Sequence, residues 1–270
     1  MESTRPIRAL MRGLDALSVL NLRDGATVSE VVGEVRLPRT TVYRILETLC
    51  DAGFVQRDPA DDRYRLTVRV RGLSEGFEDE AWITQVARPL IHELSADIIW
   101  PVAIATLSDT AMLVREATDH TSPLATERYS AGIRMPLLAS ACGLAYLAHC
   151  PVAVRDSLLE QLARSRKPED QLARARDELL RRLDEIRTQG HALVVRNRHG
   201  ADDHAIAVPV LLGEQVAAAL SVRVNAEGMS GQAAVERFLP KLRECARRIR
   251  EEYSQHKAGA ARPLAPAEAV

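Results

Sequence analysis

Apolar residues recur at helical spacing near the start of the chain. Between residues 7 and 22 they form a single stripe made of Ile7, Leu10, Leu14, Leu17 and Leu20. This spacing predicts a helix that buries one face. Thr27, followed three residues later by Glu30, has the form of a capping box, and it predicts a second short helix that runs to about Val35.

A third helix is predicted after the Leu-Pro step at residues 37–38, which ends the second helix. It starts near Arg39 or Thr40, and its expected buried face consists of Val42, Ile45, Leu46 and Leu49. Gly53 is suited to the left-handed position that follows a helix. Two short strands of a hairpin are then expected at 54–57 and 63–66. The predicted order is helix, helix, helix, hairpin.

The rest of the chain predicts a second domain of mixed type. Residues 67–98 are expected to be a linker helix and then the first helix of that domain, with a break or kink at Pro89. Strands are predicted at 98–107, 111–117, 191–196, 205–212 and 216–224. Further helices are predicted at 138–150, 152–164, 172–189 and 231–256. Helices mixed with antiparallel strands indicate an α+β domain.

Composition and charge narrow the class of protein. A chain of 270 residues with 46% hydrophobic residues can bury the cores of two domains. Its net charge of -1 excludes a general polycation, so any surface that binds nucleic acid must be local. The four cysteines are scattered without a CxxC pair, as is typical of reduced thiols. With no apolar leader and no apolar run of membrane length, a cytoplasmic protein without a membrane partner is expected.

The third helix and the hairpin carry side chains suited to DNA. The candidate DNA-binding residues are Arg39, Thr40, Thr41, Tyr43, Arg44, Arg57, Arg63 and Arg65. Arginine binds guanine edges or phosphates, and hydroxyl groups bind phosphates, while the second helix of a helix-turn-helix enters the major groove. Residues 36–71 hold eight arginines against five acidic residues. The alternative is a solvated helix face on a small three-helix domain.

The sequence from residue 8 to 66 resembles the winged helix-turn-helix of IclR-type bacterial transcriptional regulators. The stretch "TVSEVVGEVRLPRTTVYRILETLCDAGFVQRDPADDRYRLT" carries the resemblance, which continues through "MPLLASACGLAYLAHCP" and "AIAVPVLLGEQVAAALSV". Three further stretches, "LTVRVRGLSEGFEDE", "IIWPVAIATL" and "AMLVREAT", are similar to the MhpR-type activators of 3-(3-hydroxyphenyl)propionate catabolism. The implied domains are a winged helix-turn-helix at 6–67, a linker helix at 68–80, a GAF-like effector domain at 81–257 and a disordered tail at 258–270.

The resemblance implies a small, often carboxylated effector in the second domain. By position, the effector-contacting sites of the family fall near Ser140, Ala141, Asp203 and Ser221. The chain departs from its relatives at Arg223, where they often carry a small polar residue. An inward Arg223 is a candidate partner for a ligand carboxylate, and the other candidates are Arg115, Arg134 and, for an aromatic ring, Trp100.

Each of these candidates has a structural alternative. Ordinary surface or salt-bridging roles are more common for arginines than ligand binding, and core packing is the more common role for a tryptophan. The small residues at 138–145 are compatible either with a ligand held by the helix start or with close packing of helix on sheet. The segment "HGADDH", which contains His199 and His204, raises a metal hypothesis, although loop histidines beside aspartates are more often polar loop groups. The sequence predicts no cofactor.

Two other classes of function compete with a regulator. An enzyme is conceivable because Cys142 is placed at a predicted helix start, but the sequence contains no GxSxG, HExxH or Gly-rich phosphate loop. A protein-interaction module is the second alternative, and it predicts no salt-dependent DNA binding. For a regulator the expected partners are promoter DNA with a pseudo-palindromic operator, a carboxylated aromatic effector, and further copies in a dimer or tetramer. RNA polymerase joins them if the protein is an activator, and a repressor of another catabolic operon remains the alternative.

Overall fold

The computed structural model describes residues 7–23, 25–74, 82–125, 129–198 and 201–260. The chain divides into two compact units, Met1–Glu78 and Asp79–Val270. Each unit has its own hydrophobic core and is described by itself.

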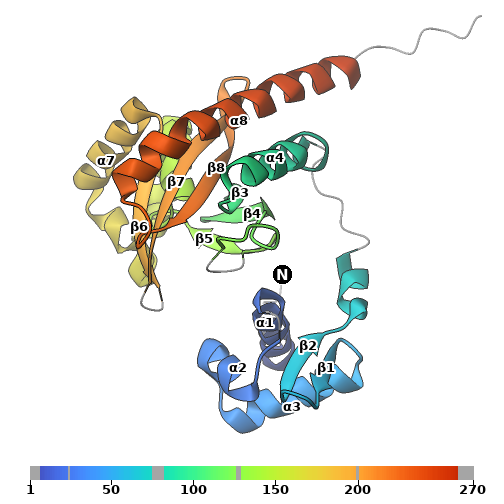
Figure 1. Ribbon diagram of the computed structural model, residues 1–270. Helices are drawn as coiled ribbons and strands as arrows, with labels where there is room; N and C mark the ends of the chain where they lie inside the picture. Colours follow the sequence, from blue (N-terminus) through green and yellow to red (C-terminus); the bar gives the residue numbers. More distant parts are fainter. Residues whose placement is uncertain (1–6, 24, 75–81, 126–128, 199–200, 261–270) are drawn as a thin grey trace, which may run out of the picture. The chain divides into compact units, whose positions relative to one another are not determined.

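The first unit contains three helices and a hairpin, in the order that the sequence predicts (Figure 1). Its elements are α1 (Arg8–Leu22), α2 (Val28–Val35), α3 (Arg39–Asp51), β1 (Val55–Asp58) and β2 (Arg63–Leu66), followed by the 3-10 helix η1 (Val68–Ser74). The capping box is confirmed, because the Thr27 side chain accepts from the Glu30 backbone and the Glu30 carboxylate accepts from Thr27 N–H. Gly53 has the left-handed φ expected of a residue after a helix.

The core of the first unit confirms the main contacts of α3. Val42 and Leu46 are fully buried, and the other two predicted residues, Ile45 and Leu49, are partly buried against them. The predicted stripe of α1 is only half right. Leu20 is buried, but Ile7, Leu10 and Leu14 are 53–69% exposed, because α1 packs on its neighbours mainly through its second half.

The second unit is built on one antiparallel sheet of six strands in the order β5-β4-β3-β8-β7-β6. Its strands are β3 (Val102–Ser108), β4 (Ala111–Ala117), β5 (Arg134–Pro136), β6 (Ala192–Arg198), β7 (Ala201–Leu212) and β8 (Gln215–Asn225). Its helices are the π-helix η2 (Ile83–Ala87), α4 (Arg88–Ile98), α5 (Ala141–His149), α6 (Val152–Ala163), the 3-10 helix η3 (Pro168–Arg174), α7 (Arg176–Gln189) and α8 (Gly231–Ala260).

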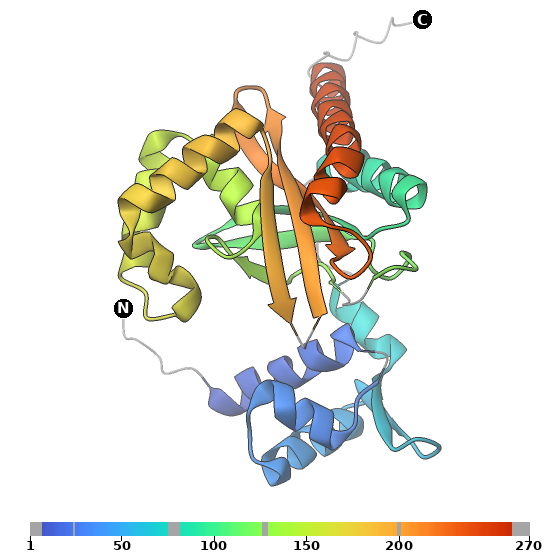
Figure 2. The same cartoon turned by 60° about the vertical axis from the view of Figure 1, so that its left-hand side comes forward.

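The sheet lies between two layers of helices, with α4 and α8 on one side and α5, α6 and α7 on the other (Figure 2). The strands β7 and β3 show the two sides clearly. Ala103, Ala105, Ala205 and Ala207 pack toward α5, and we call this side the α5 face. The alternate residues, such as Ile104 and Ile206, pack toward α4 and α8.

Several predicted boundaries differ from the structure. The short strand β5 was not predicted, because three residues are too few to show the alternation of apolar and polar residues that indicates a strand. Pro89 is accommodated in the first turn of α4, directly after the π-helix. The predicted linker helix continues only as η1 to Ser74, and residues 75–81 lie outside the described residues. Helix α8 extends to Ala260, into the segment expected to be disordered. Within the described ranges, no helix is both long and apolar enough to cross a bilayer.

Candidate DNA interface and effector site

Helix α3 begins without a side-chain cap. Its N-cap residue is Pro38, whose side chain cannot accept a hydrogen bond, so the N-cap residue forms no capping hydrogen bond with the first N–H groups of α3. The first turns of α3 carry the exposed residues Arg39, Thr40, Tyr43 and Arg44, and Thr41 is partly buried. An uncapped helix start attracts anions through its free N–H groups and its dipole. The beginning of α3 is therefore suited to a DNA phosphate or to a base edge in the groove.

The two arginines of α3 differ in how they are held. Arg39 donates to the Ser29 hydroxyl of α2 at 2.6 Å, which fixes its position and leaves its charge unneutralised. Arg44 is exposed and has no ion-pair partner among the described residues. Arg44 can therefore reach an external acceptor without first breaking an ion pair.

The three arginines of the hairpin are all paired within the first unit. The Arg57 guanidinium donates to Asp62 at 2.6 Å, and Arg65 donates to Asp61 at 2.5 and 2.9 Å and to Asp58 at 2.9 Å. The hydrogen bond from Arg65 lowers the pKa of Asp61 to about 2, so this carboxylate stays ionised near neutral pH. The structure therefore groups the hairpin arginines with acidic residues, which the sequence alone did not indicate.

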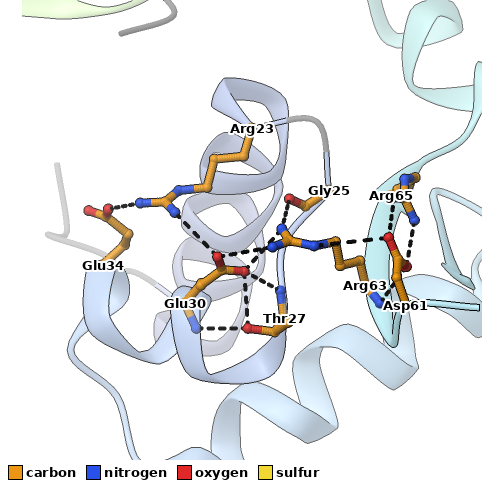
Figure 3. Close-up of polar contacts among 8 residues, drawn as sticks. All are labelled: Arg23, Gly25, Thr27, Glu30, Glu34, Asp61, Arg63 and Arg65. Carbon is orange, nitrogen blue, oxygen red and sulfur yellow. Dashed lines mark hydrogen bonds and ion pairs between the residues drawn. The ribbon is translucent and has the colours of Figure 1, made fainter. Parts of the chain in front are cut away.

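The guanidinium of Arg63 points toward Glu30 of α2, whereas Arg65 pairs with Asp61 (Figure 3). It donates to Gly25 O at 2.9 Å and to the Glu30 carboxylate at 3.2 Å. Glu30 also accepts from Thr27 N–H at 2.7 Å, and Arg23 lies 3.9 Å from it. One carboxylate therefore caps α2 and anchors the hairpin at the same time.

Replacing Glu30 by alanine is expected to lower the free energy of unfolding of the first unit by about 1 kcal/mol, because the capping hydrogen bonds are lost. The hydrogen bonds from Thr27, and then the charges of Arg63 and Arg23, lower the pKa of Glu30 below its ordinary value of 4.5. Its contribution is thus complete above pH 4.5 and is lost as the pH falls through the folded pKa.

Calorimetry of the first unit's transition at several pH values measures this effect. The difference between wild type and Glu30→Ala should be largest near neutral pH and shrink in acid. Glu34→Ala is the matched control, because among the described residues the one ion-pair partner of Glu34 is Arg23, at 2.6 Å. An equal loss in both variants would contradict the double role of Glu30.

The candidate effector residues that gather together lie at one end of the α5 face. Ser221 and Arg223 alternate along β8 with Val222 and Val224, which belong to the opposite core, so both lie on the α5 face. Asp203 lies on the same face of the neighbouring strand β7, and it is buried.

A buried ion pair completes this end of the α5 face. Arg223, which is 6% exposed, donates to Asp119, which is 4% exposed and follows β4. The guanidinium lies 3.9 Å from the centre of the Tyr129 ring. Burial lowers the pKa of Arg223 to about 10, so it remains charged at neutral pH. The second carboxylate oxygen of Asp119 is buried and has no hydrogen-bond partner in the described structure.

Helix α5 starts beside the alanine-rich part of the α5 face. Ser140 is its N-cap: its hydroxyl accepts from Gly143 N–H at 3.1 Å and donates to Pro136 O at 2.7 Å. Ala141 is buried in the first turn. The hydroxyl of Ser140 thus supports the helix, and only the remaining N–H groups of the first turn are suited to a ligand carboxylate.

Three predicted effector residues do not join this group. Arg115 donates to the Thr106 hydroxyl at 3.1 Å, and Thr106 lies on the sheet side that faces α4. Arg134 is exposed and donates to Ser108 O at 2.9 Å, which fastens the turn between β3 and β4. Trp100 packs against the core under α4 and α8. For these residues the geometry favours the structural alternatives.

The structure gives no support to the metal hypothesis. Among the residues that can be described, no group of three or more His, Cys, Asp or Glu side chains is arranged to hold a metal ion. His199 itself lies outside the described residues. Asp119 and Tyr129 are the functional candidates that the sequence did not single out, because their partner Arg223 is about a hundred residues away along the chain.

Comparisons with known proteins agree with this arrangement. Residues 9–59 match the family model of the IclR helix-turn-helix domain, and residues 78–251 match that of the bacterial transcriptional regulator IclR C-terminal domain. The second match alone covers more than half of the chain. The two matched regions correspond to the two compact units.

Curated relatives and solved structures extend the similarity over most of the chain. The chain is 28% identical to the HTH-type transcriptional regulator TsaQ1/TsaQ2 of Comamonas testosteroni over 75% of this chain and 72% of the relative. It is 28% identical to the HTH-type transcriptional regulator BhcR of Paracoccus denitrificans over 82% of this chain and 78% of the relative. An IclR homologue of Microbacterium hydrocarbonoxydans, solved with 4-hydroxybenzoate, matches with a TM-score of 0.59 at 24% identity, over 92% of this chain and 99% of that one.

A regulator of Alicyclobacillus acidocaldarius matches with a TM-score of 0.58 at 22% identity, over 92% of this chain and 99% of that one. The two solved structures show that the fold is shared, and the two curated relatives are transcriptional regulators, so the similarity supports a regulator and not an enzyme. The chain is therefore a member of the IclR family of bacterial transcriptional regulators: a DNA-binding protein, with a winged helix-turn-helix and an α+β effector domain, that responds to a small ligand.

Proposed function

We propose that this regulator activates an operon for the degradation of aromatic acids, of the hydroxyphenylpropionate type, when such an acid binds its effector domain. The observation that carries the proposal is the buried group of Arg223, Asp119 and Tyr129 on the α5 face. Buried charges are costly, and they are frequent at functional sites.

The chemistry of this group suits a hydroxylated aromatic acid. Tyr129 offers an aromatic surface, and the unpartnered oxygen of Asp119 can accept from a ligand hydroxyl. The remaining N–H groups at the start of α5 suit the ligand carboxylate. The IclR homologue solved with 4-hydroxybenzoate has the same fold and binds a ligand of this class.

The proposal includes the assembly on DNA. One winged domain has a small contact area and limited affinity, so a homodimer or tetramer on a pseudo-palindromic operator is expected. As an activator, the ligand-bound form recruits RNA polymerase. A reporter driven by the adjacent operon determines the sign of control: expression should rise with both the regulator and the acid present, whereas higher expression after deletion of the gene would make the protein a repressor.

Thermal shift of the full chain with phenylpropionates, benzoates and short keto acids tests the ligand class. A hydroxylated aromatic acid at about a hundred times its Kd should stabilise the effector domain by about 2.7 kcal/mol, since a ligand that binds only the native state shifts the unfolding equilibrium. Short keto acids should shift the transition less. Absence of a shift with every aromatic acid would remove this ligand class.

Two hydroxyl deletions on the same sheet provide a matched pair. Ser221→Ala removes a hydroxyl on the α5 face, and Thr106→Val removes one on the opposite face. We expect Ser221→Ala to reduce the ligand-induced shift and Thr106→Val to preserve it. A shift that is unchanged in Ser221→Ala and reduced in Thr106→Val would place the ligand elsewhere.

A further inference from the structure

The hairpin of the winged domain has no net charge. Between Val55 and Leu66 it contains three arginines, at 57, 63 and 65, and three aspartates, at 58, 61 and 62. Residues 36–71 as a whole hold eight arginines and five acidic residues. The surplus of three therefore comes entirely from outside the hairpin, where five arginines stand against two acidic residues.

The charges of the hairpin are also neutralised locally. Asp61 accepts hydrogen bonds from both terminal nitrogens of Arg65, at 2.9 and 2.5 Å. One oxygen of Asp62 lies 2.6 Å from Nε and 2.5 Å from Nη2 of Arg57. The Arg57 guanidinium lies 5.6 Å from the centre of the Tyr64 ring. Arg57 and Arg65 are thus held by acidic residues of the hairpin itself, whereas Arg63 is held by Glu30 of α2.

Such exposed ion pairs are individually weak, and a phosphate can compete for the arginine. The net charge decides the outcome. When an arginine leaves its aspartate for a phosphate, the aspartate remains beside the DNA and repels it, so a neutral hairpin releases few counterions on binding. By contrast, in the described part of the chain no acidic residue pairs with Arg44 or Arg39 at the start of α3, and Arg39 donates to the neutral hydroxyl of Ser29.

We propose that Asp61 and Asp62 are specificity-determining residues that restrain the affinity of the wing for DNA of any sequence. They cancel the charges of Arg65 and Arg57, so that binding depends on the contacts of α3, which distinguish bases. Phosphate contacts are the source of non-specific affinity, and the specific-to-random ratio determines occupancy of an operator in a genome. A lower affinity of the wing for phosphates raises the ratio of specific to random binding.

The test compares binding of the full chain to a random-sequence duplex of about 30 base pairs by fluorescence anisotropy between 50 and 200 mM salt. Asp61→Asn with Asp62→Asn should raise this affinity about tenfold and make the slope of log K against log salt steeper by about 1 to 2, because Arg57 loses its aspartate and Arg65 keeps only Asp58 of its two acidic partners in the hairpin. The double variant should fold, because asparagine keeps the acceptor for Arg63 N–H and tolerates the left-handed φ of +57° at position 62.

The matched control is Asp15→Asn with Asp51→Asn. Both aspartates are exposed residues of the same domain, and the variant has the same change in net charge. We expect it to change the affinity by less than threefold. An equal gain in the control would show a general charge effect and overturn the proposal, as would no gain in the wing variant.

A second pair of variants tests the arginines directly. Arg57→Ala with Arg65→Ala, added to the two asparagine substitutions, should cancel the gain, because the hairpin then has no net charge again. The arginine pair without the asparagine substitutions should lower random-duplex affinity, because the aspartates are then no longer neutralised. If the fourfold variant keeps the full gain, Arg57 and Arg65 do not provide it and the proposal is wrong.

Discussion

Gly143→Ala is expected to destabilise the effector domain of the regulator strongly. Gly143 lies in the first turns of α5, and a methyl group at this position would be 2.1 Å from Leu137 O and 2.5 Å from Leu137 Cα. These are backbone atoms in a segment that Ser140 ties to both Pro136 O and Gly143 N–H. The clash therefore cannot be relieved by rotating a side chain.

The expected loss is about 3 kcal/mol or more in the free energy of unfolding, at the upper end of the range for overpacked cores. Calorimetry of the full chain measures it, since the transition of the effector domain should move or vanish while that of the winged domain remains. Gly33→Ala is the control, because it makes the same change inside a helix with no atom within 4 Å of the added methyl group. It should stabilise α2 slightly. A Gly143→Ala protein that melts like wild type would mean that α5 can move away from Leu137.

Arg44→Ala should lower affinity for the operator by 10- to 100-fold, a loss of about 1–3 kcal/mol. Arg44 is exposed near the uncapped start of α3 and has no ion-pair partner in the described residues, so its guanidinium is available to DNA. If it binds a phosphate, the slope of log K against log salt should fall by about 1 for each bound winged domain, and random and operator DNA should be affected alike. If it binds a guanine, operator DNA alone should lose affinity.

A gel-shift salt series with the region upstream of the gene measures both quantities. Arg250→Ala is the matched control, because Arg250 is an exposed arginine of α8 in the effector domain. Arg39→Ala provides a second variant on α3, where the bond to Ser29 is also lost. Specific binding that survives both Arg44→Ala and Arg39→Ala would show that α3 does not read the operator.

The first domain could be predicted well because its signals are local. The capping box, the apolar spacing of α3 and Gly53 each lie within a few residues, and the structure confirms all three. The pairing in the hairpin could not be predicted, since it depends on the register that sets Asp58 opposite Arg63 and Arg57 opposite Tyr64. The charge count along residues 36–71 gave the surplus of the whole stretch and did not divide it between α3 and the hairpin.

The candidate effector site on the α5 face was harder to predict, because it also depends on contacts between residues that are far apart along the chain. Arg223 was singled out because it departs from the family, but its partner Asp119 follows a strand on the other side of β3, and nothing in the sequence links the two. Arg115 and Arg134 looked equivalent to Arg223 in the sequence. Only the face of the sheet and the turn between β3 and β4 distinguish them, and both depend on strand order.

The shared use of Glu30 has a consequence for how the winged domain unfolds. The same carboxylate holds the first turn of α2 and, through Arg63, the hairpin that follows α3. Neither part can open without removing a partner from the other, which couples two segments that are more than thirty residues apart. The helix and the hairpin should therefore lose their protection from amide hydrogen exchange together, as one cooperative unit.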